Sequence, residues 1–301
     1  MSAVLNYIVS EKNSGKTIEK ILKSEYGISS GLMTELKYNG RLRLNGEVCK
    51  SVDIAATGDL ICADVSEDLR QDSKFNRYRM ELDILFEDEF LIVVNKPGGI
   101  ASHPCPSNRE ETLANGIMYY WDRKGEYHNY HIVNRLDKDT SGICVIAKNR
   151  FAHGVLSQQM KNNMFKKTYS AIVRGVPFPE DGTIEMPIKR AKGSVIKREA
   201  SLDGKYAKTI YKLTQTSNNK QFSHVEINLE TGRTHQIRVH FLYIGHPLVG
   251  DWLYGDGDNE RHLINRHALH ARKIEFFHPA TKEKLMFITD IPDEMKKLLK
   301  L

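Results

Sequence analysis

Residues 131–149, HIVNRLDKDTSGICVIAKN, constrain the fold of this chain more than any other stretch. Residues 142–147 form an unbroken run of small, β-branched and apolar residues, which predicts a strand buried on both faces. The charged and hydroxyl-bearing residues 134–141, directly before this run, predict a tight polar turn. A polar loop anchored on a rigid buried strand can hold a functional side chain accurately, although the same pattern also fits an ordinary solvated turn.

Two further stretches join a polar cluster to an apolar run. They are residues 166–175, KKTYSAIVRG, and residues 231–251, TGRTHQIRVHFLYIGHPLVGD. The first predicts a strand over residues 167–173, in which Tyr169 taken alone fits an ordinary strand aromatic. The second predicts a helix over residues 234–243 that puts Arg238 on one face with Thr234 and Leu242.

Together the three stretches form a specific pattern. Residues 134–142, NRLDKDTSG, stand where RluA-type RNA pseudouridine synthases have HRLDxDTSG, and the chain closely resembles that family over about residues 82–290. The resemblance implies an isomerase that converts uridine in RNA to pseudouridine. Because this reaction transfers no electrons and hydrolyses nothing, we expect no cofactor and no metal.

The resemblance implies three catalytic residues. Asp137 is the carboxylate that acts as nucleophile or base, and the sequence leaves open whether it attacks the sugar or the uracil ring. A cleft that excludes water raises the pKa of a carboxylate, and the family places an arginine, here Arg238, beside it to keep it ionised. Tyr169 corresponds to the tyrosine that stacks on the flipped uracil, a contact worth roughly 1–3 kcal/mol.

Other residues of the same motifs are implied to bind the RNA. Arg135 matches an arginine that helps displace the target base and fills the gap it leaves. Asn134 replaces the usual histidine, which keeps hydrogen bonding but loses a titrating imidazole. Arg233 and His235 belong to the third motif and are expected substrate contacts.

The chain is expected to divide into a domain over residues 1–65, a linker over residues 66–80 and a catalytic domain over residues 81–301. The first part predicts two short helices and a hairpin with an Asn-Gly turn, similar to the alpha-L RNA-binding motif. Lys37, Arg41 and Arg43 are its expected phosphate contacts. A small α+β cap with a solvated basic face is the alternative.

Many strands, few helices and no regular βα alternation predict an α+β fold, with a mainly antiparallel, mixed sheet in the catalytic domain and a small α+β domain before it. The chain carries 44 basic and 38 acidic residues, a formal net charge of +6, which has the sign that polyanion binding needs. Residues 177–209 are its densest basic segment and fit either a solvated face or an RNA-holding hairpin.

The expected partner is RNA, ribosomal first and transfer RNA second, and the expected form is a cytoplasmic monomer. No apolar run has the roughly 20 residues needed to span a membrane, and the four widely spaced cysteines indicate reduced thiols. The histidine spacings do not fit metal ligands. A catalytically inactive RNA-binding protein on the same fold, or an unrelated small-molecule enzyme, are the alternatives.

Overall fold

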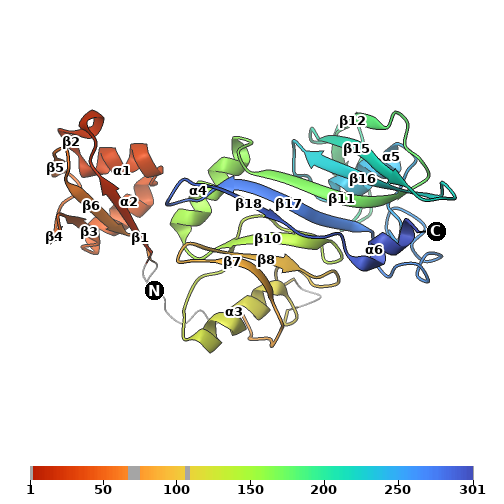
Figure 1. The fold of residues 1–301 in the computed structure, drawn as a ribbon, viewed down its shortest axis with the longest axis horizontal. Coiled ribbons are helices and arrows are strands. Elements are labelled where there is room, and N and C mark those ends of the chain that lie inside the picture. The colour runs from red at the N-terminus through yellow and green to blue at the C-terminus, as the bar shows by residue number, and fades with distance from the viewer. Residues whose placement is uncertain (1–2, 67–74, 106–108, 301) are drawn as a thin grey trace.

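The computed structural model describes residues 3–66, 75–105 and 109–300. Figure 1 shows a small N-terminal unit at one end of an elongated molecule and a large sheet that fills the rest. Residues 67–74 of the predicted linker lie outside the described residues. Helices and strands are present in both parts, which confirms the predicted α+β class.

The N-terminal unit is built on a four-stranded sheet in the order β1-β6-β3-β4. Its strands are β1 (Val4–Ile8), β3 (Leu42–Leu44), β4 (Glu47–Val48) and β6 (Leu60–Asp64), and a small second sheet pairs β2 (Lys16–Thr17) with β5 (Ile54–Ala55). The sequence did not predict β1. Asn45 and Gly46 both have positive φ, 52° and 90°, as the predicted Asn-Gly turn requires.

Two helices lie against this sheet at the positions the sequence predicts. Helix α1 (Ile18–Tyr26) begins after Thr17, whose hydroxyl accepts from the amide of Lys20, and helix α2 (Ser30–Tyr38) begins after Ser29 in the same way. A short 3-10 helix (Glu11–Asn13) precedes them. Gly27 has φ 65°, and this left-handed residue ends α1.

The N-terminal unit contacts the larger part through the end of α1. The ring of Tyr26 packs edge-on against Phe151, with ring centroids 6.3 Å apart, and Lys282 lies 5.0 Å above the Tyr26 ring. Lys282 also pairs with Glu25 at 3.3 Å. Buried apolar residues of both parts join one continuous core cluster, so the unit is packed against its neighbour.

The large sheet has ten strands, with the path β12-β15-β16-β11-β17-β10-β8-β7, β18 paired to β17 and β9 paired to β10. Only β10 and β17 run parallel among the strand pairs of this sheet in the described residues. The strands are β7 (Asp83–Glu87), β8 (Leu91–Lys96), β9 (His131–Ile132), β10 (Ser141–Ala147), β11 (Lys166–Arg174), β12 (Asp181–Glu185), β15 (Lys208–Thr216), β16 (Phe222–Leu229), β17 (Leu269–Phe277) and β18 (Lys284–Ile288).

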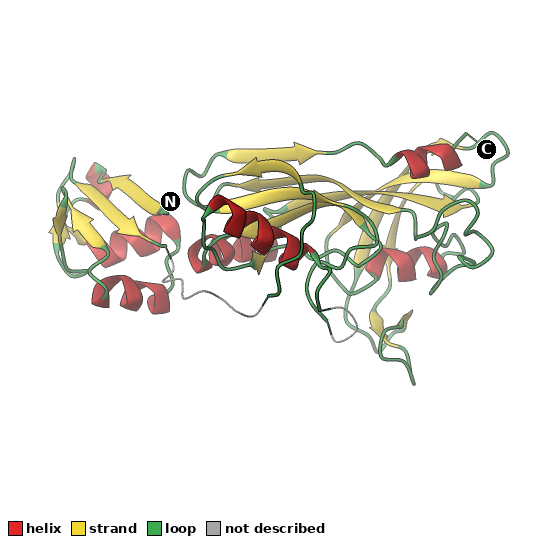
Figure 2. Ribbon diagram, turned by 90° about the horizontal axis from the view of Figure 1, so that it is seen from below, coloured by secondary structure: helices red, strands yellow, loops and turns green. Residues whose placement is uncertain are grey.

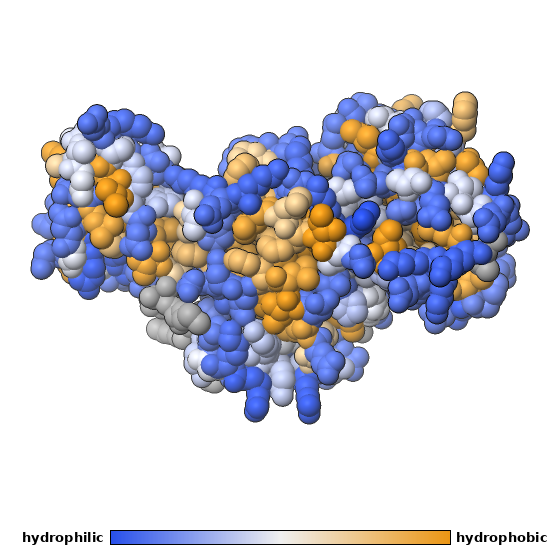
Figure 3. All heavy atoms as spheres, in the orientation of Figure 1, coloured by the Kyte–Doolittle hydropathy of each residue, from blue (hydrophilic) through white to orange (hydrophobic). Residues whose placement is uncertain are grey.

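Helices cover both faces of this sheet, which Figure 2 shows nearly edge-on, with α6 beside the C-terminus on one face and the other helices of this part on the opposite face. They are α3 (Leu113–Lys124), α4 (Arg150–Lys161), α5 (Gln236–Tyr243) and α6 (Asp293–Leu298). The sequence did not predict α3. On the side of the molecule seen in Figure 3, apolar side chains gather across the middle of the sheet; Met286 and Ile288 of β18 are both more than half exposed.

Strand β10 lies inside the sheet, between β17 and β8, and all seven of its residues are buried, as predicted. Gly142 makes its parallel pairing with β17 possible. Its φ is 113°, and a Cβ atom there would lie 2.3 Å from the carbonyl oxygen of Ala271. Because no larger side chain fits, Gly142 allows the loop before β10 to enter the sheet directly beside β17.

A basic hairpin projects from the region between β12 and β15. Its strands are β13 (Ile188–Arg190) and β14 (Arg198–Ala200), which form a two-stranded sheet, and Ile188 also bridges to Lys205. This is the segment that the sequence marked as its densest run of positive charge. Val195 and Leu202, 81% and 86% exposed, add apolar surface near the hairpin.

Candidate active site

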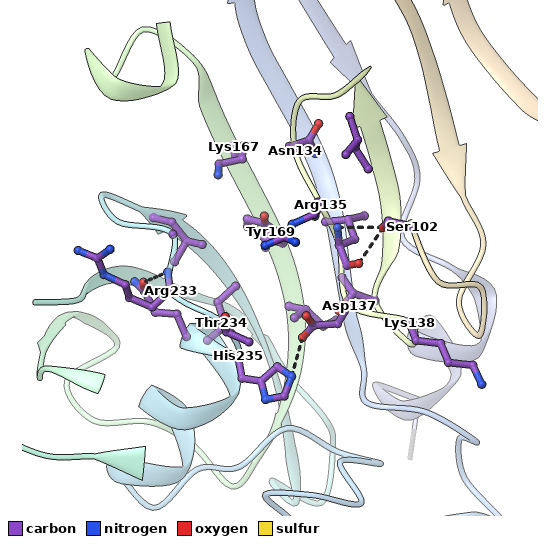
Figure 4. A pocket seen from close by; sticks show the side chains of 18 of the residues that line it. Ser102, Asn134, Arg135, Asp137, Lys138, Lys167, Tyr169, Arg233, Thr234 and His235 are labelled. Atoms are coloured by element: carbon purple, nitrogen blue, oxygen red, sulfur yellow. Dashed lines mark hydrogen bonds and ion pairs between the residues drawn. The ribbon is translucent and has the colours of Figure 1, made fainter. Parts of the chain in front are cut away.

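A cavity of about 770 Å³ brings the three sequence motifs together. Figure 4 shows its wall, built from the loop before β10, the start of β11 and the turn before α5. Every site residue predicted in the larger part of the chain lines it: Asn134, Arg135, Asp137, Tyr169, Arg233, His235 and Arg238. Stretches far apart in sequence therefore form one site.

The loop that carries Asp137 is fixed through its backbone. Ser102 Oγ donates to the carbonyl of Leu136 at 2.8 Å and accepts from its amide at 3.2 Å. Lys96, whose pKa burial lowers to about 8, donates to the carbonyl of Lys138 at 3.1 Å. These buried side chains hold the residues on both sides of Asp137, so the loop is preorganised. Neither role was predicted from the sequence.

The Asp137 carboxylate lies between two cationic or potentially cationic groups. Its Oδ2 is 3.6 Å from Nη1 of Arg238 and 3.7 Å from Nε2 of His235. The Asp137 side chain is 33% exposed toward the cavity, whereas that of Arg238 is 5% exposed. A partly exposed carboxylate beside a buried guanidinium can face a substrate bound in the cavity.

Arg238 is held by a second carboxylate that was not predicted from the sequence. Nε and Nη2 of Arg238 each donate to Asp251 at 2.7 Å, and the Asp251 side chain is fully buried. Burial opposes the charge of both partners, but their pairing prevails: the pKa of Asp251 is lowered and that of Arg238 raised. A charged residue directly after the apolar run of residues 248–250 was the available sequence signal.

The turn before α5 aims His235 at Asp137. The sequence predicted a helix from residue 234, and this is wrong at its start: the helix begins at Gln236, and His235 precedes it in a left-handed conformation with φ 59°. Thr234 is consequently not on a helical face with Arg238. Arg238 and Leu242 lie four residues apart within α5 and do share a helical side, although Arg238 is buried and Leu242 is 42% exposed.

Tyr254 selects the tautomer of His235. The Tyr254 hydroxyl accepts from the backbone amide of Arg198 at 2.7 Å and lies 2.8 Å from Nδ1 of His235. The Tyr254 hydroxyl can therefore donate its own proton to Nδ1 of His235. A neutral imidazole then carries its single N–H proton on Nε2, the nitrogen that faces Asp137. Burial lowers the pKa of His235 and favours this neutral form, although Asp137 opposes the shift.

Tyr169 lies on β11, which is separated from β10 by β17, and its ring lines the cavity. The residue is 7% exposed. Burial raises the pKa of its hydroxyl far above the ordinary value, and the charge of Asp137 adds to the shift. A permanently protonated ring at this place offers a flat apolar face to a planar base.

Asn134 and Arg135 are adjacent but have different surroundings. The Asn134 amide donates to the carbonyl of Ile143 at 2.9 Å and accepts from the amide of Val145 at 2.8 Å, and the residue is 3% exposed. It therefore fastens the loop to β10, a role that needs no titrating ring. Arg135 is exposed at the mouth of the cavity.

The three basic residues predicted in the N-terminal unit do not line the cavity. Lys37 is exposed, with its ammonium 5.7 Å from the ring of Tyr38, which is 78% exposed. Arg43 is exposed and donates to the carbonyl of Gly46 at 3.0 Å. Arg41 is more enclosed, because its guanidinium donates to the Ser66 carbonyl and lies 3.9 Å from Glu35.

The described residues contain no group of three or more histidines, cysteines or acids placed to hold a metal ion. His235 contacts Tyr254 and Asp137, and His240 contacts Thr209 and the carbonyl of Met186. None of the helices in ranges 3–66, 75–105 and 109–300 has the length and apolar character of a membrane span.

Residues 90–243 match the family model described as RNA pseudouridylate synthase, and this range holds the first two motifs and the third motif as far as Tyr243. The chain belongs to this family. The RNA pseudouridylate synthase core accounts for the mixed sheet and the positions of the three motifs within it, and the resemblance to RluA-type enzymes is confirmed.

Relatives extend the likeness beyond that range. The uncharacterized RNA pseudouridine synthase YhcT of Bacillus subtilis (strain 168) is 40% identical over 98% of this chain and 96% of its own length. The ribosomal large subunit pseudouridine synthase D of Pseudomonas aeruginosa is 35% identical over 87% of this chain and 84% of its own. Among solved structures, human RNA pseudouridylate synthase domain containing 1 is 26% identical, with a TM-score of 0.58 over 70% of this chain and 83% of that one.

Proposed function

We propose that this RNA pseudouridylate synthase isomerises specific uridines of ribosomal RNA to pseudouridine, with Asp137 as the catalytic carboxylate. The observation that carries the proposal is the placement of Asp137, on a loop fixed from both sides, 3.6 Å from the guanidinium of Arg238. Ribosomal RNA is favoured over transfer RNA because a relative that matches over most of the chain is named for the large ribosomal subunit.

The chemistry that the site must support is a rearrangement within one nucleotide. The bond from C1′ to N1 breaks, the base rotates, a bond from C1′ to C5 forms, and the proton on C5 is replaced by one on N1. Asp137 can serve as nucleophile or base in this sequence. Arg238 places a positive charge 3.6 Å from Asp137, and the Nε2 atom of His235 faces the same carboxylate at 3.7 Å.

The residues around Asp137 can bind the target uridine and the RNA that carries it. The target base must leave its stack to reach a carboxylate inside a cavity. Tyr169 offers the flipped base a flat face, and exposed Arg135 at the mouth can occupy the vacated position in the RNA. The intact set of Asp137, Arg238 and Tyr169 favours an active enzyme over an inactive RNA-binding protein.

The remaining parts of the proposal concern partners and location. Lys37 and Arg43, both exposed, are proposed to contact phosphates from the N-terminal unit, and Arg41 would have to leave Glu35 to do so. We further propose that the protein acts as a monomer in the cytoplasm. Support for a reducing compartment comes from its four cysteines, all free thiols.

The test is to map pseudouridine at single-nucleotide resolution in ribosomal and transfer RNA from cells with and without this gene. We expect one or a few ribosomal sites to revert to uridine in its absence. The wild-type chain should restore them, and Asp137→Asn should not. Loss of sites in transfer RNA alone would move the substrate to that class, and no lost site in either RNA would contradict the proposed activity.

A further inference from the structure

Lys167 lines the active-site cavity and has no part in the chemistry assigned to Asp137, Arg238 and Tyr169. It lies two residues before Tyr169 on β11 (Lys166–Arg174), so the two side chains leave the strand on the same face. Figure 4 shows both of them at the cavity, with Lys167 on the side of Asn134 and away from His235. The register of β11 against β17 shifts between Thr168 and Tyr169, but the extra residue, Arg272, is on β17. Strand β11 itself keeps a regular pairing with β16 at these residues.

The ammonium of Lys167 has no hydrogen-bond or ion-pair partner within the described residues. Burial alone lowers its pKa, with no acidic group to oppose the shift. Lys167 is partly exposed toward the cavity. The fully buried lysines are instead satisfied inside the protein: Lys96 donates to three carbonyls, and Lys148 pairs with Glu87 at 2.8 Å. A partly desolvated cation without a protein partner is available to an incoming anion.

The charge balance of the cavity wall agrees with an anionic ligand. Asp137 is the one acidic residue that lines it among the described residues. The cationic residues of the wall are Arg135, Lys138, Lys167, Arg233 and Arg238. Since Arg238 is already paired with Asp251, the wall retains more positive charge than its own carboxylate can neutralise.

Lys167 is placed away from the reacting carboxylate. Besides burial, the charge of Asp137 raises the pKa of Tyr169, whereas burial alone acts on the pKa of Lys167, which agrees with a greater separation between Lys167 and Asp137. If the Tyr169 ring stacks on the flipped base, the ammonium two residues along the strand reaches the part of the nucleotide beyond the base and the reacting sugar carbon. That part of an RNA strand is the phosphodiester.

We propose that Lys167 binds a non-bridging oxygen of the phosphate next to the flipped uridine and so holds that nucleotide in the cavity. This inference rests on the proposed function, since it takes RNA as the ligand. The lysine–phosphate contact has the same free energy in the bound substrate and in the transition state. Its loss therefore changes KM more than kcat.

The experiment compares Lys167→Met with wild type on an RNA stem-loop that contains a uridine identified by the pseudouridine mapping. We expect KM to rise about tenfold or more, as for loss of one charge-assisted bond, with kcat within about twofold. The slope of log affinity against log salt should fall by about 0.7, the value for one phosphate contact on a single strand. Lys167→Arg should recover most of the lost affinity.

A methylphosphonate placed singly on either side of the target uridine identifies the phosphate. At one position it should weaken wild-type binding and leave Lys167→Met unaffected, because the two changes remove the same contact. Lys166→Met is the matched control, since Lys166 is the exposed neighbour on the opposite face of β11. Its KM and salt slope should stay at the wild-type values.

Two further readouts separate the possible failures. Lys167→Met should melt close to the wild-type temperature, because it removes a partly exposed charge that has no partner among the described residues of the protein. A large fall would assign Lys167 a structural role and overturn the inference. An unchanged KM and salt slope, or a loss confined to kcat, would overturn it as well. If wild type binds the RNA but makes no pseudouridine, the proposed function fails, and the salt slopes still decide the role of Lys167.

Discussion

Arg238 donates two hydrogen bonds of 2.7 Å to Asp251, and this bidentate pair fixes the guanidinium before any substrate is present. The third nitrogen, Nη1, lies 3.6 Å from the Asp137 carboxylate. Asp251 is therefore the residue that orients Arg238, while Asp137 benefits from its charge. Planar, two-point recognition of this kind cannot be reproduced by lysine, because lysine offers a single point charge.

The first prediction concerns Asp251→Asn. The amide cannot accept both hydrogen bonds, so Arg238 loses its fixed orientation, and kcat should fall at least tenfold with a smaller change in KM. Breaking a buried pair should also lower the free energy of unfolding by about 3–5 kcal/mol. Single-turnover kinetics and denaturant melts measure the two effects. Wild-type kcat in a folded Asp251→Asn protein would show that Asp251 does not orient Arg238 for catalysis.

The second prediction concerns the hydroxyl of Tyr254. Tyr254→Phe keeps the ring 4.9 Å from the Arg238 guanidinium but removes the donor to Nδ1 of His235. That donor stabilises the neutral imidazole, so its loss should raise the pKa of His235. The charged groups that also act on His235 are Asp137, Arg238, Arg198 and Asp251, and all four remain.

NMR titration of the His235 ring measures this shift directly. We expect the pKa to move upward by up to about one unit and the ring to lose its Nε2-protonated tautomer in the neutral form. Phenylalanine in place of Tyr206, a half-exposed tyrosine that bonds Glu185, is the control and should leave the His235 titration unchanged. The same pKa in wild type and Tyr254→Phe would contradict the assigned tautomer.

The third prediction concerns pH and the buried acid Glu87. Burial raises its pKa, but the hydrogen bonds from Lys148 and Tyr120 prevail and lower it from 4.5 to about 2. A carboxyl whose pKa is lowered on folding stabilises the protein above its unfolded value. This contribution is lost as the pH falls from about 4.5 toward 2.

Glu87→Gln should consequently cost roughly 2 kcal/mol of unfolding free energy at pH 7. The difference from wild type should shrink steadily below pH 4.5, because wild type is then losing the same charge. Urea denaturation across this range measures it. A difference that stays constant with pH would show that Glu87 acts through packing alone.

The fourth prediction concerns the N-terminal unit. Replacing both Lys37 and Arg43 by alanine should flatten the slope of log RNA affinity against log salt by about 0.7–0.9 for each phosphate that these side chains neutralise in wild type. Turnover on saturating RNA should persist, since every group assigned to chemistry lies elsewhere. Lys20→Ala, an exposed lysine of α1, is the control. An unchanged slope in the double variant would remove these residues from RNA binding.

Local sequence pattern predicted the elements that depend on neighbours in the chain. Strand β10 was predicted by its apolar run, helix α1 by its apolar spacing and the glycine that follows it, and helix α2 by its capping serine and apolar residues. Contacts across long separations were not predictable in this way. Ser102 bonds Leu136 from 34 residues away, and nothing in the sequence around Ser102 indicates that partner.

The residues of the candidate site likewise separate into those that local motifs predicted and those that they did not. Asp137, Tyr169 and Arg238 stand within dense polar motifs, and the fold brings all three to one cavity. Asp251, the last residue of the third motif, and Tyr254, which lies beyond it, also support the site but were not singled out from the sequence. The helix start was misplaced because His235 adopts a left-handed backbone, which is uncommon for any residue other than glycine and was not inferred from the sequence.

The role of Asp137 is tested most directly by assaying purified wild type and Asp137→Asn on ribosomal RNA from cells that lack this gene. Asp258→Asn, the same change at an exposed carboxylate paired with Arg261, is the control. We expect Asp137→Asn to fold and bind RNA like wild type and to form no detectable pseudouridine, while the control keeps full activity. Substantial pseudouridine formation by folded Asp137→Asn would contradict the catalytic role of Asp137.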